Sequence, residues 1–177
     1  MNTGAVIYGN HGFFFKDGGS YTVPSSGTAG RNAKPGAADT AWVDMGIIEK
    51  ATVQHNRDTK DIFAPTPGVL RMHDRVETKR QIIFKLTGVE MSPLMFEMLF
   101  GTLSLTSAST QYNPLEGGTK RGWIKIQQYD QTDTLRNTVD MFCHIQIDGE
   151  VSFSDDIVKA DYTCTGLHSI YNTGTLS

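Results

Sequence analysis

The residues that could ligate a metal ion or act as acid–base catalysts are scattered along the chain. Its five histidines show neither HxH nor HxxxH spacing, the arrangements that bring two imidazoles to one ion. Asp140, His144 and Asp148 share one face of an expected strand, but residues four apart lie roughly 13 Å from each other at the usual strand rise. The adjacent carboxylates Asp155 and Asp156 would point to opposite sides of a strand, and we interpret them as a turn. We therefore expect no metal, no cofactor and no enzymatic activity.

Nucleophilic and phosphate-binding motifs are equally weak. The chain has no G-x-S-x-G motif, and residues 116–120 (EGGTK) lack the G-x-x-x-x-G-K-[ST] spacing of a phosphate-binding loop. Cys143 and Cys164 lie in strand-like stretches beside apolar residues and show no zinc-like CxxC spacing. We interpret both as free thiols of the core. A disulfide between neighbouring strands is the alternative.

A nucleic-acid site would need exposed aromatic side chains interleaved with basic residues. Trp123, Lys125 and Tyr129, on one face of an expected strand, come closest to that pattern. A half-covered strand with its lysine in water explains them better. The formal net charge is −3 and the pI is about 5.9, which argues against a protein that grips phosphates. It does not exclude a protein past which DNA slides.

The stretch from Gln81 to Gly101 predicts a strand followed by a short helix. Ile82, Phe84 and Leu86 alternate with polar residues, the period-2 pattern of a half-buried strand. Ser92 offers an N-cap hydroxyl before Pro93, so the helix is expected over residues 93–100. The helix residues expected to pack are Leu94, Met95, Phe96, Met98 and Leu99. A short helix that is apolar nearly all round needs cover on more than one side, so we expect a sheet on one side and a neighbouring subunit on the other.

The remaining patterns predict a mainly-β fold. Alternation of apolar and polar residues indicates strands over residues 47–54, 122–129, 139–147 and 158–164. Together with the strand before the helix, these favour a β-sandwich or barrel of six to eight strands with one short flanking helix. We expect residues 42–177 to form this single domain. No apolar run has the length of a signal-peptide core or a membrane span.

Residues 1–41 are interpreted as an extended arm. They hold eight of the 18 glycines and few apolar residues apart from Phe13, Phe14 and Phe15. Ordering such a segment costs on the order of 1 kcal/mol per residue in backbone entropy, so something must hold it. We expect the three phenylalanines to anchor the arm on a neighbouring subunit. The alternative is that the arm folds back onto its own domain.

Residues 55–80 predict a long hairpin that projects from the domain. The apolar alternation fails here, charges of both signs accumulate, and Pro65-Thr66-Pro67-Gly68 marks a turn. Twenty-six residues is far longer than an ordinary loop, and loops of that length tend to be functional or disordered. Mixed charges on such a segment either form a solvated face or set register and partner choice at a contact between subunits.

The serial order of these elements resembles the major tail tube proteins of long-tailed bacteriophages with non-contractile tails. No single motif is specific, and the order of the elements carries the likeness. The residues that carry it are Trp42, Asp44, Gly46, Ile47, Val53, Thr59, Lys60, Asp61, Ile62, Gly68 and residues 82–101, with a weaker match over residues 139–168.

The resemblance implies a β-sandwich protomer that forms stacked, hexameric rings around a channel for DNA. It implies a tape measure protein, tail terminator and tail tip proteins as partners, no membrane, and a virion protein made in the host bacterial cytoplasm. The hairpin would reach the adjacent ring, through candidate contacts Arg57, Lys60, Asp61, Arg71, Asp74, Arg75 and Glu77. The alternatives are another ring-forming tail or secretion-tube component of the same fold, and a β-sandwich ligand-binding module.

Overall fold

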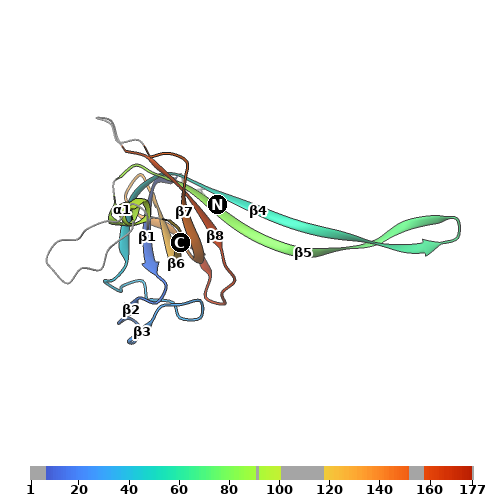
Figure 1. Cartoon of the computed structure of the whole chain (residues 1–177), viewed down its shortest axis with the longest axis horizontal. Helices are drawn as coiled ribbons and strands as arrows, with labels where there is room; N and C mark the ends of the chain where they lie inside the picture. The colour runs from blue at the N-terminus through green and yellow to red at the C-terminus, as the bar shows by residue number, and fades with distance from the viewer. Residues whose placement is uncertain (1–6, 91, 101–117, 152–157, 177) are drawn as a thin grey trace.

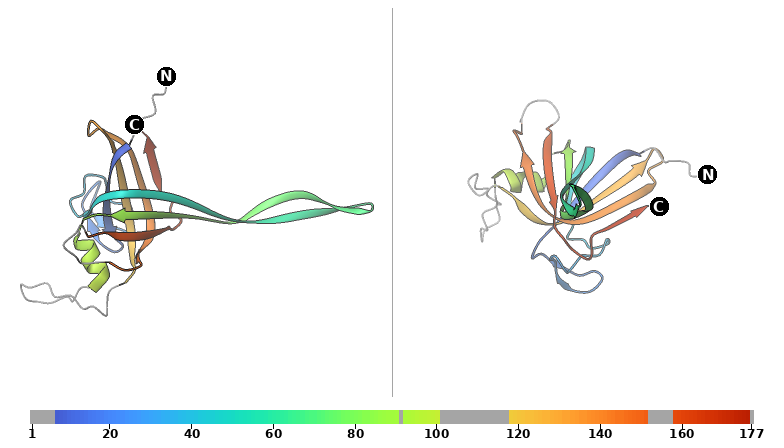
Figure 2. Two further views of the ribbon diagram at one scale, coloured as in Figure 1. Left: turned by 90° about the horizontal axis from the view of Figure 1, so that it is seen from above. Right: turned by 90° about the vertical axis from the view of Figure 1, so that its right-hand side faces the viewer.

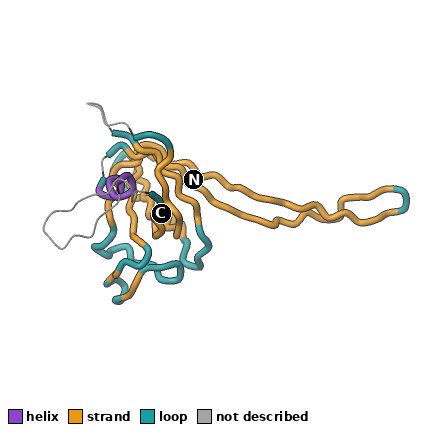
Figure 3. Tube along the Cα trace, in the orientation of Figure 1, coloured by secondary structure: helices purple, strands orange, loops and turns teal. Residues whose placement is uncertain are grey.

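The structure is a computed structural model of the chain, and it describes residues 7–90, 92–100, 118–151 and 158–176. Most of the described chain is β-strand, with one short helix (Figures 1 and 3). Residues 116–117 and the pair Asp155-Asp156 lie outside the described residues. The elements are β1 (Ile7–Lys16), β2 (Ser20–Tyr21), β3 (Gly27–Thr28), β4 (Val43–Thr66), β5 (Val69–Gly88), α1 (Pro93–Phe100), β6 (Lys120–Asp130), β7 (Leu135–Asp148), β8 (Ala160–Gly166) and β9 (Thr173–Leu176).

The main sheet closes on itself into a barrel. Its strands follow the order β6-β1-β4-β5-β8-β7-β9. Because β6, at one end of this order, also pairs with β7 near the other end, the sheet closes. Every pairing is antiparallel. β9 pairs with residues 137–140 of β7, along the edge that β8 occupies further on. The expected mainly-β architecture is thus observed, as a closed antiparallel sheet.

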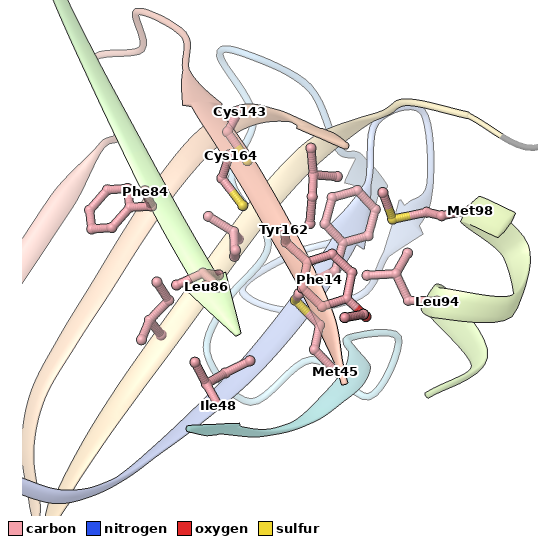
Figure 4. Packing of buried hydrophobic residues seen from close by; sticks show 14 of the residues in the cluster. Phe14, Met45, Ile48, Phe84, Leu86, Leu94, Met98, Cys143, Tyr162 and Cys164 are labelled. Atoms are coloured by element: carbon pink, nitrogen blue, oxygen red, sulfur yellow. The ribbon is translucent and has the colours of Figure 1, made fainter. Parts of the chain in front are cut away.

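Side chains are buried on both faces of part of the barrel wall, because consecutive strand residues point to opposite sides. Phe14, Ile124 and Met141 belong to the cluster that fills the barrel interior, where Figure 4 shows the Phe14 ring. Their neighbours Phe15, Trp123 and Phe142 form a second cluster on the outside of the wall. Residues 17–42 cover that cluster, and the indole Nε1 of Trp123 donates to the Gly30 carbonyl at 2.9 Å.

Residues 7–41 belong to the barrel domain, which corrects the expectation of an extended arm. β1 lies between β4 and β6, and Phe14 and Phe15 are each only 2% exposed. The carboxylate of Asp39 accepts from the Thr22 amide at 2.6 Å and from the Ala41 amide at 2.9 Å, which holds the loop in place. Burial of the Phe14 and Phe15 rings against the chain's own strands offsets the ordering entropy, so these two rings are not available to anchor a neighbouring subunit, whereas Phe13 is half-buried. The alternative, an N-terminal segment folded onto its own domain, is the one observed.

Helix α1 begins and ends where the sequence predicts and lies against one end of the barrel (Figure 2). The Met95 amide donates to the Ser92 hydroxyl at 3.2 Å, which confirms the N-cap. Leu94 and Met98 point toward Phe14 in the interior cluster (Figure 4). Met95 is buried as well, whereas Phe96 and Leu99 are half-buried. The chain's own barrel therefore covers one side of the helix, and a neighbouring subunit on the other side stays a prediction.

Candidate functional site

The most distinctive surface of the molecule is the hairpin of β4 and β5. The two strands pair from Ile48 opposite Gly88 to Thr66 opposite Val69, and Gly68 in the turn has a φ of +87°, which favours glycine. Near the barrel, β1 flanks β4 only as far as Ile48, and β8 flanks β5 only from Ile83 onward. Beyond those points the two strands continue as a two-stranded ribbon that projects from the barrel (Figures 1 and 2). The projecting hairpin expected at residues 55–80 is therefore present.

The register gives this ribbon two distinct sides. Its two register shifts beyond the barrel place the extra residues on β5, so alternation along β4 is unbroken from Lys50 to the turn. Residues directly opposite each other share a side. We call the side that continues from the barrel interior the inner side. It holds the pairs Val53–Phe84, His55–Ile82, Arg57–Arg80, Thr59–Glu77, Asp61–Arg75 and Phe63–Met72, and Leu70 nearer the turn.

Ion pairs occupy the middle of the inner side. Arg75 donates to both carboxylate oxygens of Asp61, at 2.6 and 3.2 Å. Arg80 likewise donates to both carboxylate oxygens of Glu77, at 3.0 and 2.8 Å. The Nε atom of Arg57 lies 3.6 Å from Oε1 of Glu77. Hydrogen bonds from the guanidinium groups lower the pKa of the Asp61 and Glu77 carboxylates. These pairs are exposed, so they add little to stability. The pairs of Arg75 with Asp61 and of Arg57 with Glu77 join the two strands, whereas Arg80 and Glu77 both lie on β5.

The seven charged residues predicted as contacts divide between the two sides of the ribbon. Those that form the ion pairs on the inner side are Arg57, Asp61, Arg75 and Glu77. Lys60, Arg71 and Asp74 lie on the outer side, opposite Val76, Ala64 and Ile62 respectively. No described residue forms an ion pair with any of these three. The Asp74 carboxylate accepts a hydrogen bond from the Arg75 backbone amide at 2.7 Å, and all three side chains are exposed on the outer side.

Sequence reasoning missed the apolar end of the hairpin. Phe63, Leu70 and Met72 share the inner side near the turn and are 55%, 69% and 56% exposed. Val69 and Ile62 lie on the outer side and are also exposed. The charge pattern drew attention to the middle of the hairpin, although the apolar residues beside the proline turn were visible. Counting the register outward from that turn would have placed three of them on one side.

The remaining chemical candidates are structural. Asp140 pairs with Lys34 and is buried, His144 is exposed, and the Asp148 carboxylate accepts from the Gln146 amide at 3.0 Å. The described residues contain no group of three His, Cys, Asp or Glu side chains placed to share a metal ion. Cys143 and Cys164 are buried free thiols. A hydrogen bond with Cys143, together with burial, raises the pKa of Cys164.

The aromatic and basic residues of β6 do not form a platform for nucleic-acid bases. Trp123 is fully buried, and Lys125 is only 3% exposed. The Lys125 ammonium lies 3.9 Å from the centre of the Trp42 ring and donates to the Ala37 carbonyl at 3.2 Å. Burial lowers the pKa of Lys125. The expectation that this lysine lies in water is wrong, because residues 34–42 cover it.

No family model matches the chain, and no curated protein matches it. Within the described residues, none of the helical structure has the length and hydrophobicity of a membrane span.

Proposed function

We propose that this protein is a structural protein whose copies assemble into stacked rings that form the tail tube of a long-tailed, non-contractile bacteriophage. The observation that carries the proposal is the hairpin. An isolated two-stranded ribbon is marginally stable in water, and this one presents large apolar side chains more than half exposed at its end. Exposed apolar groups that cluster in this way are typical of surfaces that a partner covers.

Copies of the same chain are the proposed partners. The hairpin extends in one direction from a compact barrel (Figure 1), so a second barrel placed along that direction would cover it. The net charge of −3 supports a conduit along which DNA phosphates slide without sticking. The resemblance stated above adds the tape measure protein within the tube, and the terminator and tip proteins at its ends. We place the assembled protein in the virion and assign it no catalytic role.

Electron microscopy of the purified protein, alone or nucleated by tail tips, tests the proposal. The expected result is rings that stack into tubes with a central hole. Rings that remain single under all conditions would favour another ring-forming component of the same fold. Persistent monomers would overturn the proposal, and stabilisation of those monomers in a thermal-shift ligand panel would favour a ligand-binding module.

A shortened hairpin separates folding from stacking. Replacing residues 57–80 with Asn-Gly joins Asn56 to Gln81, which already face each other across the ribbon, through a favoured two-residue turn. The barrel strands and both core clusters lie outside the deleted residues. We expect the circular dichroism spectrum of the variant to remain that of a folded β protein, and we expect the variant to form no tubes. Tubes of normal length from this variant would refute the role assigned to the hairpin.

A further inference from the structure

The barrel interior is incompletely closed at the end from which the hairpin leaves. A groove of about 320 Å³ opens there. Its apolar lining consists of inward-facing core positions, namely Val53, Ile82, Phe84, Val139 and Met141, and its rim includes Thr173 and Gly174 of β9. Val53 is 52% exposed, although it directly opposes Phe84, which is 8% exposed. We call this surface the root groove.

The topology explains why the root groove is open. β8 ends at Gly166, whereas β5 continues past its last partner, Ile83, toward the turn. β1 likewise pairs with β4 no further than Ile48. The inner side of the ribbon therefore leaves the barrel still carrying apolar side chains, and none of the described strands covers them there. The root groove is therefore a part of the hydrophobic core that the chain's own side chains leave uncovered.

The other end of the same ribbon carries the complementary feature. Phe63, Leu70 and Met72 lie on the inner side near the turn, and each is more than half exposed. A large side chain presents about 150–250 Å², so together these three expose roughly 300 Å² of mostly apolar surface. We call them the tip patch. No described residue outside the ribbon approaches the ribbon's free end (Figures 1 and 2).

A hairpin cannot fill its own root groove. The strand from Asn56 to Thr66 spans roughly 35 Å at the usual rise per residue, and the ribbon extends away from the barrel without folding back (Figure 1). A second copy, displaced along the ribbon, can bring its root groove to the tip. Donor and acceptor surfaces then belong to different molecules, and every molecule has one of each.

We propose that the tip patch of one copy docks into the root groove of a second copy. This inference rests on the proposed function and specifies the contact between successive rings. Such a head-to-tail contact does not close and repeats along a line. One tip buries far less than the roughly 1,000 Å² expected of a stable interface. A single contact is therefore weak, and several contacts made together around a ring give the stacking its strength.

Site-specific cross-linking tests the contact directly. Leu70→Cys marks the tip patch, and Gly174→Cys marks the rim of the groove, where an added Cβ meets no atom within 4 Å. The native Cys143 and Cys164 are buried and do not compete. The two variants are mixed and treated with a short bis-maleimide. The matched control replaces Leu70→Cys with Val69→Cys, an adjacent residue of similar exposure on the outer side.

We expect the Leu70→Cys and Gly174→Cys mixture to yield about tenfold more cross-linked dimer than the control, because a bound pair holds its thiols at a high effective concentration. Tubes without this cross-link would overturn the inference and leave the proposed function standing. The cross-link without rings would support the docking and overturn the tube. Equal yields from the two mixtures would overturn the docking, whatever assembly is seen.

A charge exchange gives an independent test. Leu70→Asp and Val53→Lys should each abolish stacking by placing a charge in an apolar contact, while Val69→Asp and Thr52→Lys, on the outer side, should not. The double variant Leu70→Asp with Val53→Lys should recover tubes through the new ion pair. Loss of stacking in Val53→Lys but not in Leu70→Asp would mean that something other than the tip occupies the groove, and would overturn the proposal.

Discussion

The three consecutive phenylalanines of β1 provide a sharp test of whether the N-terminal segment belongs to its own domain. Phe14 packs in the interior cluster and Phe15 in the outer cluster, each 2% exposed, whereas Phe13 is half-buried and stacks on His11 with ring centroids 4.7 Å apart. Replacing a buried phenylalanine with alanine costs about 3–5 kcal/mol. We therefore expect Phe14→Ala and Phe15→Ala each to lose about that much stability, and Phe13→Ala to lose only about 1 kcal/mol.

The measurement is urea unfolding of the monomer, followed by tryptophan fluorescence at a protein concentration too low for assembly. Domains of this size unfold with a free energy of about 5–15 kcal/mol, so either large loss would move the midpoint far from that of the wild type. Phe13→Ala is the internal control, since it changes the same side chain on the same strand. If Phe14→Ala and Phe15→Ala left the monomer stable and abolished only assembly, the burial of β1 in its own barrel would be refuted.

Three further outcomes follow from individual contacts. Ser92→Ala should cost about 1 kcal/mol of stability in the same urea assay, because the helix loses its N-cap, and an unchanged midpoint would contradict the cap. Hydrogen bonds from the Thr132 hydroxyl and amide lower the pKa of Asp130. The stability lost in Asp130→Asn should therefore be fully present above about pH 4 and shrink as the pH falls further; a loss that does not change with pH would refute this. Cys143 and Cys164 should react with a thiol reagent only on unfolding, and rapid labelling of the native protein would show that the interior is not closed around them.

Local patterns predicted the elements whose surroundings are simple. Helix α1 was predicted to the residue because Ser92 and Pro93 mark its start chemically. The strand at residues 139–147 was found because its inward positions, such as Met141 and Ile145, are apolar in strict alternation. The turn at residues 65–68 was found because proline and glycine restrict or permit particular backbone angles.

Strand β1 was not predicted because its place in the sheet depends on pairing with β4 and β6, which are distant in sequence. Its glycines and its three successive aromatic rings do not alternate in polarity, since both faces of the strand are covered. Phe15 is buried by Trp42 and Trp123, which no local pattern connects to it. β6 and β7 form a local hairpin, but the sheet closes only because β6 also pairs with β1, more than 100 residues earlier in the chain, and no local pattern indicates that pairing.

The candidate site was predicted in outline and corrected in detail. The hairpin's length and turn residues predicted that it projects, but the pairing register decides which charges meet. Arg75 and Asp61 are 14 residues apart in sequence, and they face each other because one extra residue on β5, His73, lies between them and the turn. Phe63 and Met72 lie between that shift and the turn, so counting residues outward from the turn places them opposite each other.

The way in which the hairpin is rooted has a mechanical consequence. β4 and β5 enter the barrel between β1 and β8, so a pull on the free end slides both strands lengthwise against their neighbours. The hydrogen bonds of an antiparallel ladder lie perpendicular to the strands, and such a pull therefore loads many of them at once and does not unzip them one after another. The hairpin therefore resists a pull along its length strongly, whereas only the two-stranded ribbon outside the barrel resists sideways bending. A filament whose subunits are joined by such hairpins would resist stretching but bend easily.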